Sequence, residues 1–87
     1  MYAIKYERRA ERELLSLSRE TARRIARAID NLAHDARPRG CRKITGSGDT
    51  HRIRVGRYRV VYEISEPEQL VVILRVAPRT ERTYRGL

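Results

Sequence analysis

The chain has 87 residues, one cysteine and a formal net charge of +9 at neutral pH. This length supports one domain, residues 1–87, with a modest core, and no apolar run is long enough to cross a bilayer. A single Cys41 excludes an internal disulfide, and the first residues do not resemble a signal peptide, so we expect a cytoplasmic protein.

The positive charge is unevenly distributed along the chain. Residues 1–35 carry a net charge of +2, whereas residues 36–87 carry +7, and almost all the basic residues are arginine. Arginine suits planar, bidentate recognition of phosphate. The basic second half therefore suggests a nucleic acid or an acidic protein segment as partner, although an Arg-rich composition alone would also scatter arginines over exposed helices.

The first third of the chain predicts a strand followed by two helices. Residues 2–6 alternate as in a short strand, and residues 7–17 then place apolar side chains at helical spacing. Ser18 is a candidate N-cap for a second helix. The second helix has a clean apolar face, made by Ala22, Ile25, Ala26, Ile29, Leu32 and Ala33. Only a short break around Ser16 and Ser18 separates the two predicted helices, which predicts an αα-hairpin. The apolar stripes of both helices are expected to belong to the core.

The rest of the chain predicts a loop and three strands. Residues 34–50 are interpreted as loop, with Pro38 after the second helix and a short extended piece beginning at Ile44. Residues 51–64 alternate on both sides of Gly56-Arg57, which indicates a β-hairpin with a two-residue turn. After a turn at 66–69, residues 70–76 are nearly all apolar and predict an interior strand that stops at Pro78.

The predicted fold is α+β in the order β-α-α-β-β-β. We expect a small, mainly antiparallel sheet with the αα-hairpin packed on its apolar face, which leaves the other face open.

Arginines gather on that other face of the predicted hairpin. With Gly56 and Arg57 as the turn, Arg54 lies directly opposite Arg59, and Arg52 lies on the same face. Like charges at such positions are destabilising, which an anion bound over the face would explain. A solvated outer face of the sheet explains the same pattern equally well, because the register is itself inferred.

The sequence offers little for metal chemistry but does fit phosphate chemistry. His34, Cys41 and His51 lack the spacing of metal ligands, so no metal or other cofactor is expected. RNA supplies its own nucleophile, the 2′-OH, so cleavage needs a base, positive charge at the phosphate and help for the leaving oxygen. The charge can come from Arg52, Arg54, Arg59 and Arg79, and Tyr84 can act as base if nearby arginines lower its pKa.

Several segments resemble the RelE/ParE superfamily of toxins from type II toxin–antitoxin systems, over nearly the whole chain. They are residues 32–38 at the second helix end, Lys43-Ile44-Thr45-Gly46, the run from Arg52 to Ile64, and the run from Val71 to Arg79. The order β-α-α-β-β-β is also the order of that family.

The resemblance implies roles for particular residues. Arg59 matches the phosphate-binding arginine of the RelE branch, Arg79 the arginine at the end of the last strand, and Tyr84 the general base. Since the pKa of arginine lies above about 12, charge stabilisation is the role expected of Arg79 rather than proton donation. The candidate catalytic residues are therefore Arg59, Arg79 and Tyr84. The candidate RNA- or phosphate-binding residues are Arg52, Arg54, Arg57 and Arg82.

The resemblance also implies a function and partners. RelE-type toxins cleave mRNA in the ribosomal A site, so the first expectation is a ribosome-dependent endoribonuclease, an mRNA interferase, that works without metal. Its partners would be the ribosome, mRNA and an acidic antitoxin that forms a hetero-oligomer with it. One alternative is a ParE-like inhibitor of DNA gyrase without nuclease activity, and another is an inactive module that binds nucleic acid or antitoxin.

Overall fold

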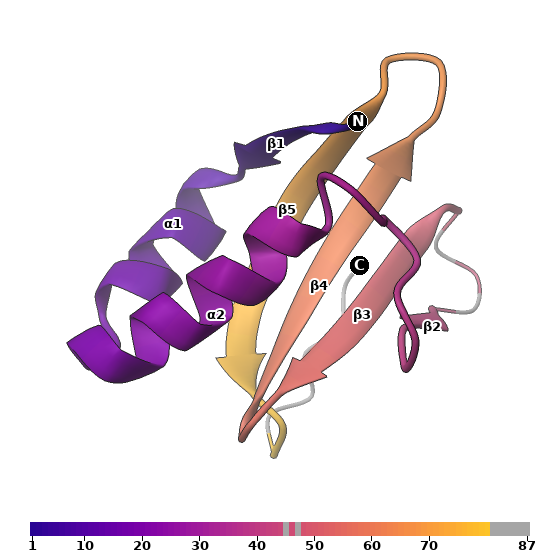
Figure 1. Ribbon diagram of the computed structural model, residues 1–87. Helices are drawn as coiled ribbons and strands as arrows, with labels where there is room; N and C mark the ends of the chain where they lie inside the picture. Colours follow the sequence, from indigo (N-terminus) through magenta and orange to yellow (C-terminus); the bar gives the residue numbers. More distant parts are fainter. Residues whose placement is uncertain (45, 47, 81–87) are drawn as a thin grey trace.

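In the described residues, two helices and a twisted sheet follow the predicted order β-α-α-β-β-β, with one additional short strand after the second helix (Figure 1). The computed structural model describes residues 1–44, 46 and 48–80. In these residues the elements are β1 (Ala3–Tyr6), α1 (Arg8–Leu15), α2 (Arg19–Asn31), β2 (Arg42–Lys43), β3 (Thr50–Val55), β4 (Tyr58–Ser65) and β5 (Leu70–Pro78).

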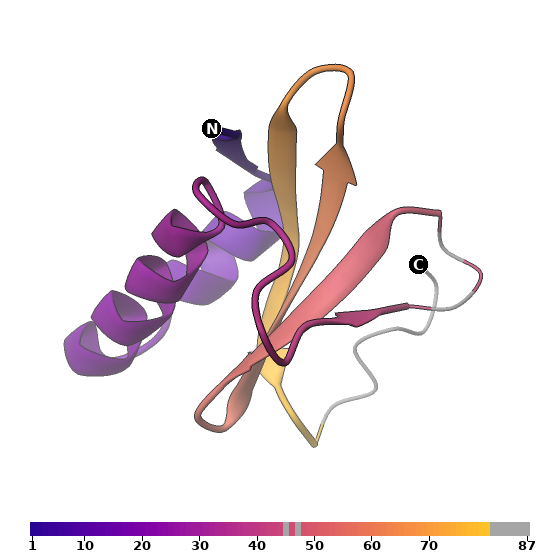
Figure 2. The same cartoon turned by 45° about the vertical axis from the view of Figure 1, so that its right-hand side comes forward.

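The sheet has the strand order β1-β5-β4-β3-β2. Of the strands that the structure describes, only β1 and β5 run parallel, with Ala3 opposite Leu70, and the other neighbours are antiparallel. Both helices lie on one side of the sheet, and no described helix covers the other side (Figure 2). The predicted α+β fold, mainly antiparallel with an αα-hairpin on one face, is thereby confirmed.

The helical hairpin forms for the reasons visible in the sequence. The Ser18 hydroxyl accepts a hydrogen bond from the Thr21 amide at 3.3 Å, so Ser18 is the predicted N-cap of α2. Ile25 and Ile29 of α2 are completely buried, as is Leu32 just after the helix. They pack in one core with buried side chains of the sheet, among them Val60, Tyr62, Val71 and Ile73. Burial of each such side chain contributes roughly 1.5–3 kcal/mol.

A partly buried ion pair ties α1 to the last strand. Arg75 Nη2 lies 2.8 Å from Glu13 Oε2, and the Val76 amide donates to Glu13 Oε1 at 2.8 Å. Glu13 thus binds both a side chain and the backbone of β5.

None of the described helices has the length and apolar character needed to cross a membrane.

The loop predicted over residues 34–50 contains one element that the pattern does not reveal. Arg42 and Lys43 form the short strand β2, with Arg42 opposite Arg52 and Lys43 opposite His51. The extended piece therefore begins before Ile44, the residue at which we expected it. Both β2 residues are exposed, so no apolar alternation marks this strand in the sequence.

Candidate phosphate-binding site

The β3–β4 hairpin has the predicted register. Val55 lies opposite Tyr58 and Arg54 opposite Arg59, so Gly56 and Arg57 form the two-residue turn. Gly56 has φ of +60°, while Arg57 does not have a positive φ, as in a type II′ turn. Glycine is therefore needed at position 56, and the turn fixes two arginines face to face.

Strand β2 adds a second pair of facing arginines next to the first. Arg42 lies opposite Arg52 across β2 and β3, just as Arg54 lies opposite Arg59 across β3 and β4. Like charges that face each other across strands are destabilising. Two such neighbouring pairs concentrate positive charge in a small area of the sheet.

The end of β5 brings a further arginine to this area. The Arg79 amide donates to the carbonyl of Arg57 at 2.8 Å, and Tyr58 lies opposite Pro78. A β-bulge upstream sets this register, because Val61 pairs with Arg75 whereas Tyr62 pairs with Ile73. The backbone thus holds Arg79 beside the tip of the hairpin.

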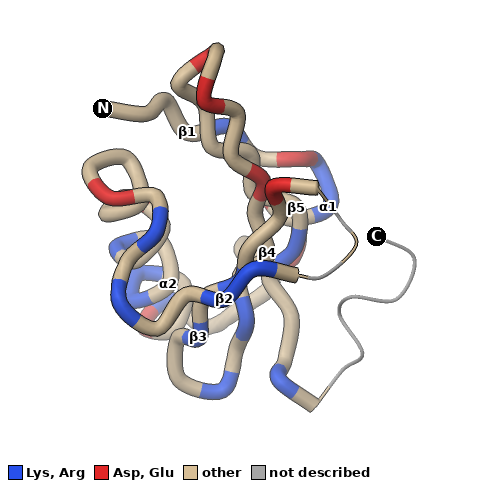
Figure 3. The backbone as a smooth tube through the Cα atoms, turned by 90° about the vertical axis from the view of Figure 1, so that its right-hand side faces the viewer, with Lys and Arg blue, Asp and Glu red and all other residues tan. Residues whose placement is uncertain are grey.

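Arg54 lies at the centre of the cluster. Its pKa is lowered from the ordinary value, first by the charge of Arg52, then by Arg79, by partial desolvation, and by Arg59 and Arg42. We call these five residues the arginine cluster. Figure 3 shows the concentration of basic residues along β2 and β3, whereas the turn between β4 and β5 is acidic. Among the described residues, no carboxylate forms an ion pair with Arg42, Arg52, Arg54 or Arg79.

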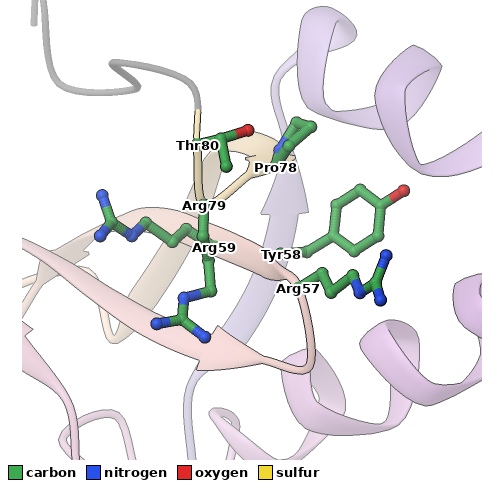
Figure 4. Close-up of a pocket in the computed structure, with 6 residues that line it drawn as sticks. All are labelled: Arg57, Tyr58, Arg59, Pro78, Arg79 and Thr80. Atoms are coloured by element: carbon green, nitrogen blue, oxygen red, sulfur yellow. The ribbon is translucent and has the colours of Figure 1, made fainter.

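Two hollows open on the cluster. The larger, of about 600 Å³, is the hairpin-tip pocket, which is lined by Arg57, Tyr58, Arg59, Pro78, Arg79 and Thr80 (Figure 4). The smaller, of about 330 Å³, is lined by Arg39, Gly40, Arg42, Arg52, Ile53 and Arg54. Each hollow therefore has several guanidinium groups and, as far as the described residues go, no carboxylate in its lining.

The basic face is less open than the sequence suggests. Arg52 is only 8% exposed and Arg59 is half-buried, whereas Arg54 and Arg79 are exposed. The prediction that the basic face is left open is therefore wrong at Arg52. Restricted exposure strengthens the interaction of the Arg52 and Arg59 guanidinium groups with a bound anion, because water screens their charge less.

The predicted site residues are not all found together. Arg57 contributes to the hairpin-tip pocket, but its side chain and that of Tyr58 point away from Arg59 and Arg79 (Figure 4). Arg82 and Tyr84 lie outside the described residues, so their assignments stay predictions. No group of three or more His, Cys, Asp or Glu side chains that could hold a metal ion occurs in the described part of the chain.

Sequence reasoning missed Arg39 and Arg42. Their place at the site depends on β2, whose pairing with β3 brings Arg42 opposite Arg52. The turn-forming glycines 46 and 48 between two basic segments were the available signal for this second hairpin.

Comparisons with known proteins agree with this fold. A family model for the ParE toxin of the type II toxin–antitoxin system parDE matches residues 4–83. No curated protein sequence matches the chain significantly. A chain of a RelE–RelB complex from the archaeon Pyrococcus horikoshii is 30% identical, with a TM-score of 0.81, over 92% of this chain and 97% of that one.

Two further structures show the same architecture. A chain of the toxin–antitoxin complex RelBE2 from Mycobacterium tuberculosis is 26% identical, with a TM-score of 0.78, over 90% of this chain and 98% of that one. A chain of the intact Escherichia coli RelBE complex is 19% identical, with a TM-score of 0.81, over 93% and 100%, which shows the fold alone. The chain belongs to the RelE/ParE superfamily of toxins from type II toxin–antitoxin systems.

Proposed function

We propose that this toxin is a ribosome-dependent endoribonuclease that cleaves mRNA without a metal ion. The observation that carries the proposal is the arginine cluster, in which Arg54 is surrounded by four other arginines and receives no carboxylate from the described residues. Such an arrangement supplies positive charge that stabilises the negative charge developing on a phosphodiester in the transition state of its cleavage.

The reaction uses the RNA's own 2′-OH. A base removes the 2′-proton, the 2′-oxygen forms a bond to phosphorus, and the bond from phosphorus to the 5′-oxygen breaks. The 5′-oxygen takes up a proton, which leaves a 2′,3′-cyclic phosphate and a 5′-OH. Arg59 and Arg79, which line the same pocket, would stabilise the extra negative charge on phosphorus.

The remaining predicted residues would serve binding and proton transfer. Arg52 and Arg54 would hold the phosphates that flank the cleaved bond, and Arg57 and Arg82 would contribute contacts farther along the strand. Tyr84 would be the base, if neighbouring guanidinium groups lower its pKa from about 10.

The test is cleavage of ribosome-bound mRNA by the purified protein. Primer extension should show cuts at the codon in the A site with the native protein. The Arg59→Ala variant should lose at least about a hundredfold in rate, as expected when one stabilising donor is removed. Arg8→Ala removes the same charge from an exposed position of α1 and should cleave normally. Equal cleavage by Arg59→Ala and the native protein would contradict the proposed site.

A second candidate function is inhibition of DNA gyrase without nuclease activity. The match of residues 4–83 to the ParE toxin family favours it. Supercoiling of relaxed plasmid by gyrase separates the two functions: a gyrase inhibitor blocks it and leaves ribosome-bound mRNA intact, whereas the endoribonuclease does the reverse.

The proposed partner is an acidic antitoxin. Structural relatives of this chain were solved as complexes of RelE with RelB. An acidic, partly disordered segment that folds on binding could place carboxylates against the arginine cluster and relieve its repulsion. A toxin that acts on ribosomes would meet this partner in the cytoplasm.

A further inference from the structure

A second basic surface lies on α2. Arg19, Arg23 and Arg27 follow one another at four-residue intervals on the helix, and all three are exposed. They line a hollow of about 490 Å³ together with Glu20 and Arg24. We call these four arginines the α2 arginine row.

The row is not neutralised by its own helix. Glu20 lies three and four residues before Arg23 and Arg24, which are the spacings that favour ion pairs on a helix. Nevertheless, no arginine of the row forms an ion pair within the described part of the chain. Successive arginines at four-residue spacing repel each other and destabilise a helix, so the row is unfavourable for the isolated protein.

The row continues into the candidate phosphate-binding site. The Arg24 guanidinium lies over Gly56 at the hairpin tip, so close that a Cβ at Gly56 would lie 3.3 Å from Arg24 Nη1. A hollow of about 250 Å³ between α2 and this turn is lined in part by Arg24, Arg57 and Tyr58. Arg57 and Tyr58 also line the hairpin-tip pocket. A basic path therefore runs from the arginine cluster around the tip to α2.

We propose that the α2 arginine row is a docking surface for the phosphate backbone of double-helical RNA. The inference rests on the proposed function, since it assigns a structured RNA partner to a surface beside the cleavage site. Arg19, Arg23 and Arg27 are spaced by about 6 Å along the helix axis, so one row can follow the phosphates of one strand. Each guanidinium can bind a phosphate through two donors.

The composition of α2 favours a duplex over a single strand. Proteins that bind single strands stack the bases on aromatic side chains, and α2 contains none. Double-helical RNA, by contrast, is recognised mainly through its shape and its sugar–phosphate backbone, which needs no aromatic platform. The Arg57 side chain points away from Arg59 (Figure 4) and lines the hollow beside α2. We therefore assign Arg57 to the connecting path rather than to the arginine cluster.

The test is the binding of a short, blunt-ended, fluorescently labelled RNA duplex to the full chain, followed by anisotropy over a range of salt concentrations. The triple variant Arg19→Ala, Arg23→Ala, Arg27→Ala should bind at least about tenfold more weakly. Its salt slope should fall by about one unit for each lost phosphate contact. Alanine is a good helix former, and circular dichroism checks that α2 is kept. The double variant Arg23→Gln, Arg27→Gln provides the same test with longer side chains.

A matched variant controls for net charge. Lys5→Ala, Arg8→Ala, Arg12→Ala also removes three exposed positive charges, none of which lines the hollow on α2, and its affinity should change less than about twofold. An equal loss in both triple variants, no binding by the native chain, or equal affinity for a DNA duplex of the same sequence would overturn the inference. Arg59→Ala should still bind the duplex, so loss of its mRNA cleavage tests the proposed function separately.

Discussion

At the scale of single residues, Arg54 has a position that opposes folding. It faces Arg59 across the hairpin, and four other arginines lower its pKa, of which Arg52 contributes most. A side chain in such surroundings is stabilised only when an anion arrives. The chain therefore holds repulsion in the free state that binding of phosphate or carboxylate relieves.

Replacement of Arg54 should separate stability from binding. Arg54→Thr introduces a residue with high β-propensity and removes the repulsion, so we expect an unchanged or higher melting temperature together with weaker RNA binding. Thermal denaturation and anisotropy measure the two effects.

The neighbouring Ile53 provides the control. It is 7% exposed and belongs to the core, so Ile53→Ala should lower stability by about 2–5 kcal/mol. If Arg54→Thr destabilises the protein to a similar extent, Arg54 has a structural role that the repulsion argument does not include.

At the scale of elements, one ionic network joins segments far apart in the sequence. Arg37, in the loop after α2, contacts Glu66 Oε2 at 2.7 Å and Asp49 Oδ2 at 3.1 Å. Glu66 also accepts a hydrogen bond from the Tyr2 hydroxyl at 2.9 Å. The network joins the N-terminus, the loop before β3 and the β4–β5 turn.

The network makes part of the protein's stability depend on pH, because this part is lost in acid. The hydrogen bond from Arg37 lowers the pKa of Glu66 below its ordinary value of 4.5. A lowered carboxyl pKa means that the contribution is fully present above about pH 4.5 and is lost as the pH falls through the lowered pKa. Glu66→Gln should therefore lower the melting temperature slightly at pH 7, and the difference from the native protein should vanish in acid.

The same turn offers a matched control. Glu68→Gln removes an equal charge from a carboxylate that has no ion pair among the described residues. If both variants show the same dependence on pH, net charge rather than the Arg37 network is responsible.

The elements also show what sequence patterns can predict. Hairpin β3–β4 and helix α2 could be predicted because their signals are local: strict alternation around Gly56-Arg57, and an apolar stripe that follows the N-cap Ser18. Strand β2 could not, because two exposed residues carry no periodicity. The parallel pairing of β1 with β5 joins Ala3 to Leu70, and no local pattern encodes it.

A residue of the candidate site could be predicted only where the strand that carries it could be predicted. Arg54 and Arg59 follow from the hairpin register, and Arg79 follows from the end of β5 beside the tip. Arg42 was missed with β2, and Arg52 is buried where an open face was expected.

At the scale of the whole molecule, the charge of +9 is polarised. Basic segments follow β2, β3 and α2, while acidic residues gather at the β4–β5 turn (Figure 3). Such a distribution steers anionic partners to these basic segments and away from the acidic turn, and it makes their binding sensitive to salt.

An antitoxin should tolerate the loss of one arginine better than catalysis does. Co-expression of the toxin with the neighbouring open reading frame should yield a co-purifying small acidic protein, both for the native chain and for Arg59→Ala. The physical reason is that a large interface distributes its energy over many contacts, whereas cleavage depends on a few groups. If no acidic protein co-purifies with the native chain, the proposed role of the basic face in toxin neutralisation is wrong.

The most direct test of the proposed chemistry uses mRNA with a single 2′-deoxy nucleotide at the codon in the ribosomal A site. The unmodified mRNA should be cut there, with a 2′,3′-cyclic phosphate on the upstream product. The cut should persist when a chelator removes divalent ions, in an experiment that uses ribosomes crosslinked beforehand so that they stay assembled. The deoxy-substituted mRNA should stay intact at that position, because its nucleophile is missing. Equal cleavage of both messages would contradict attack by the 2′-OH, and intact messages together with blocked supercoiling by gyrase would contradict the endoribonuclease altogether.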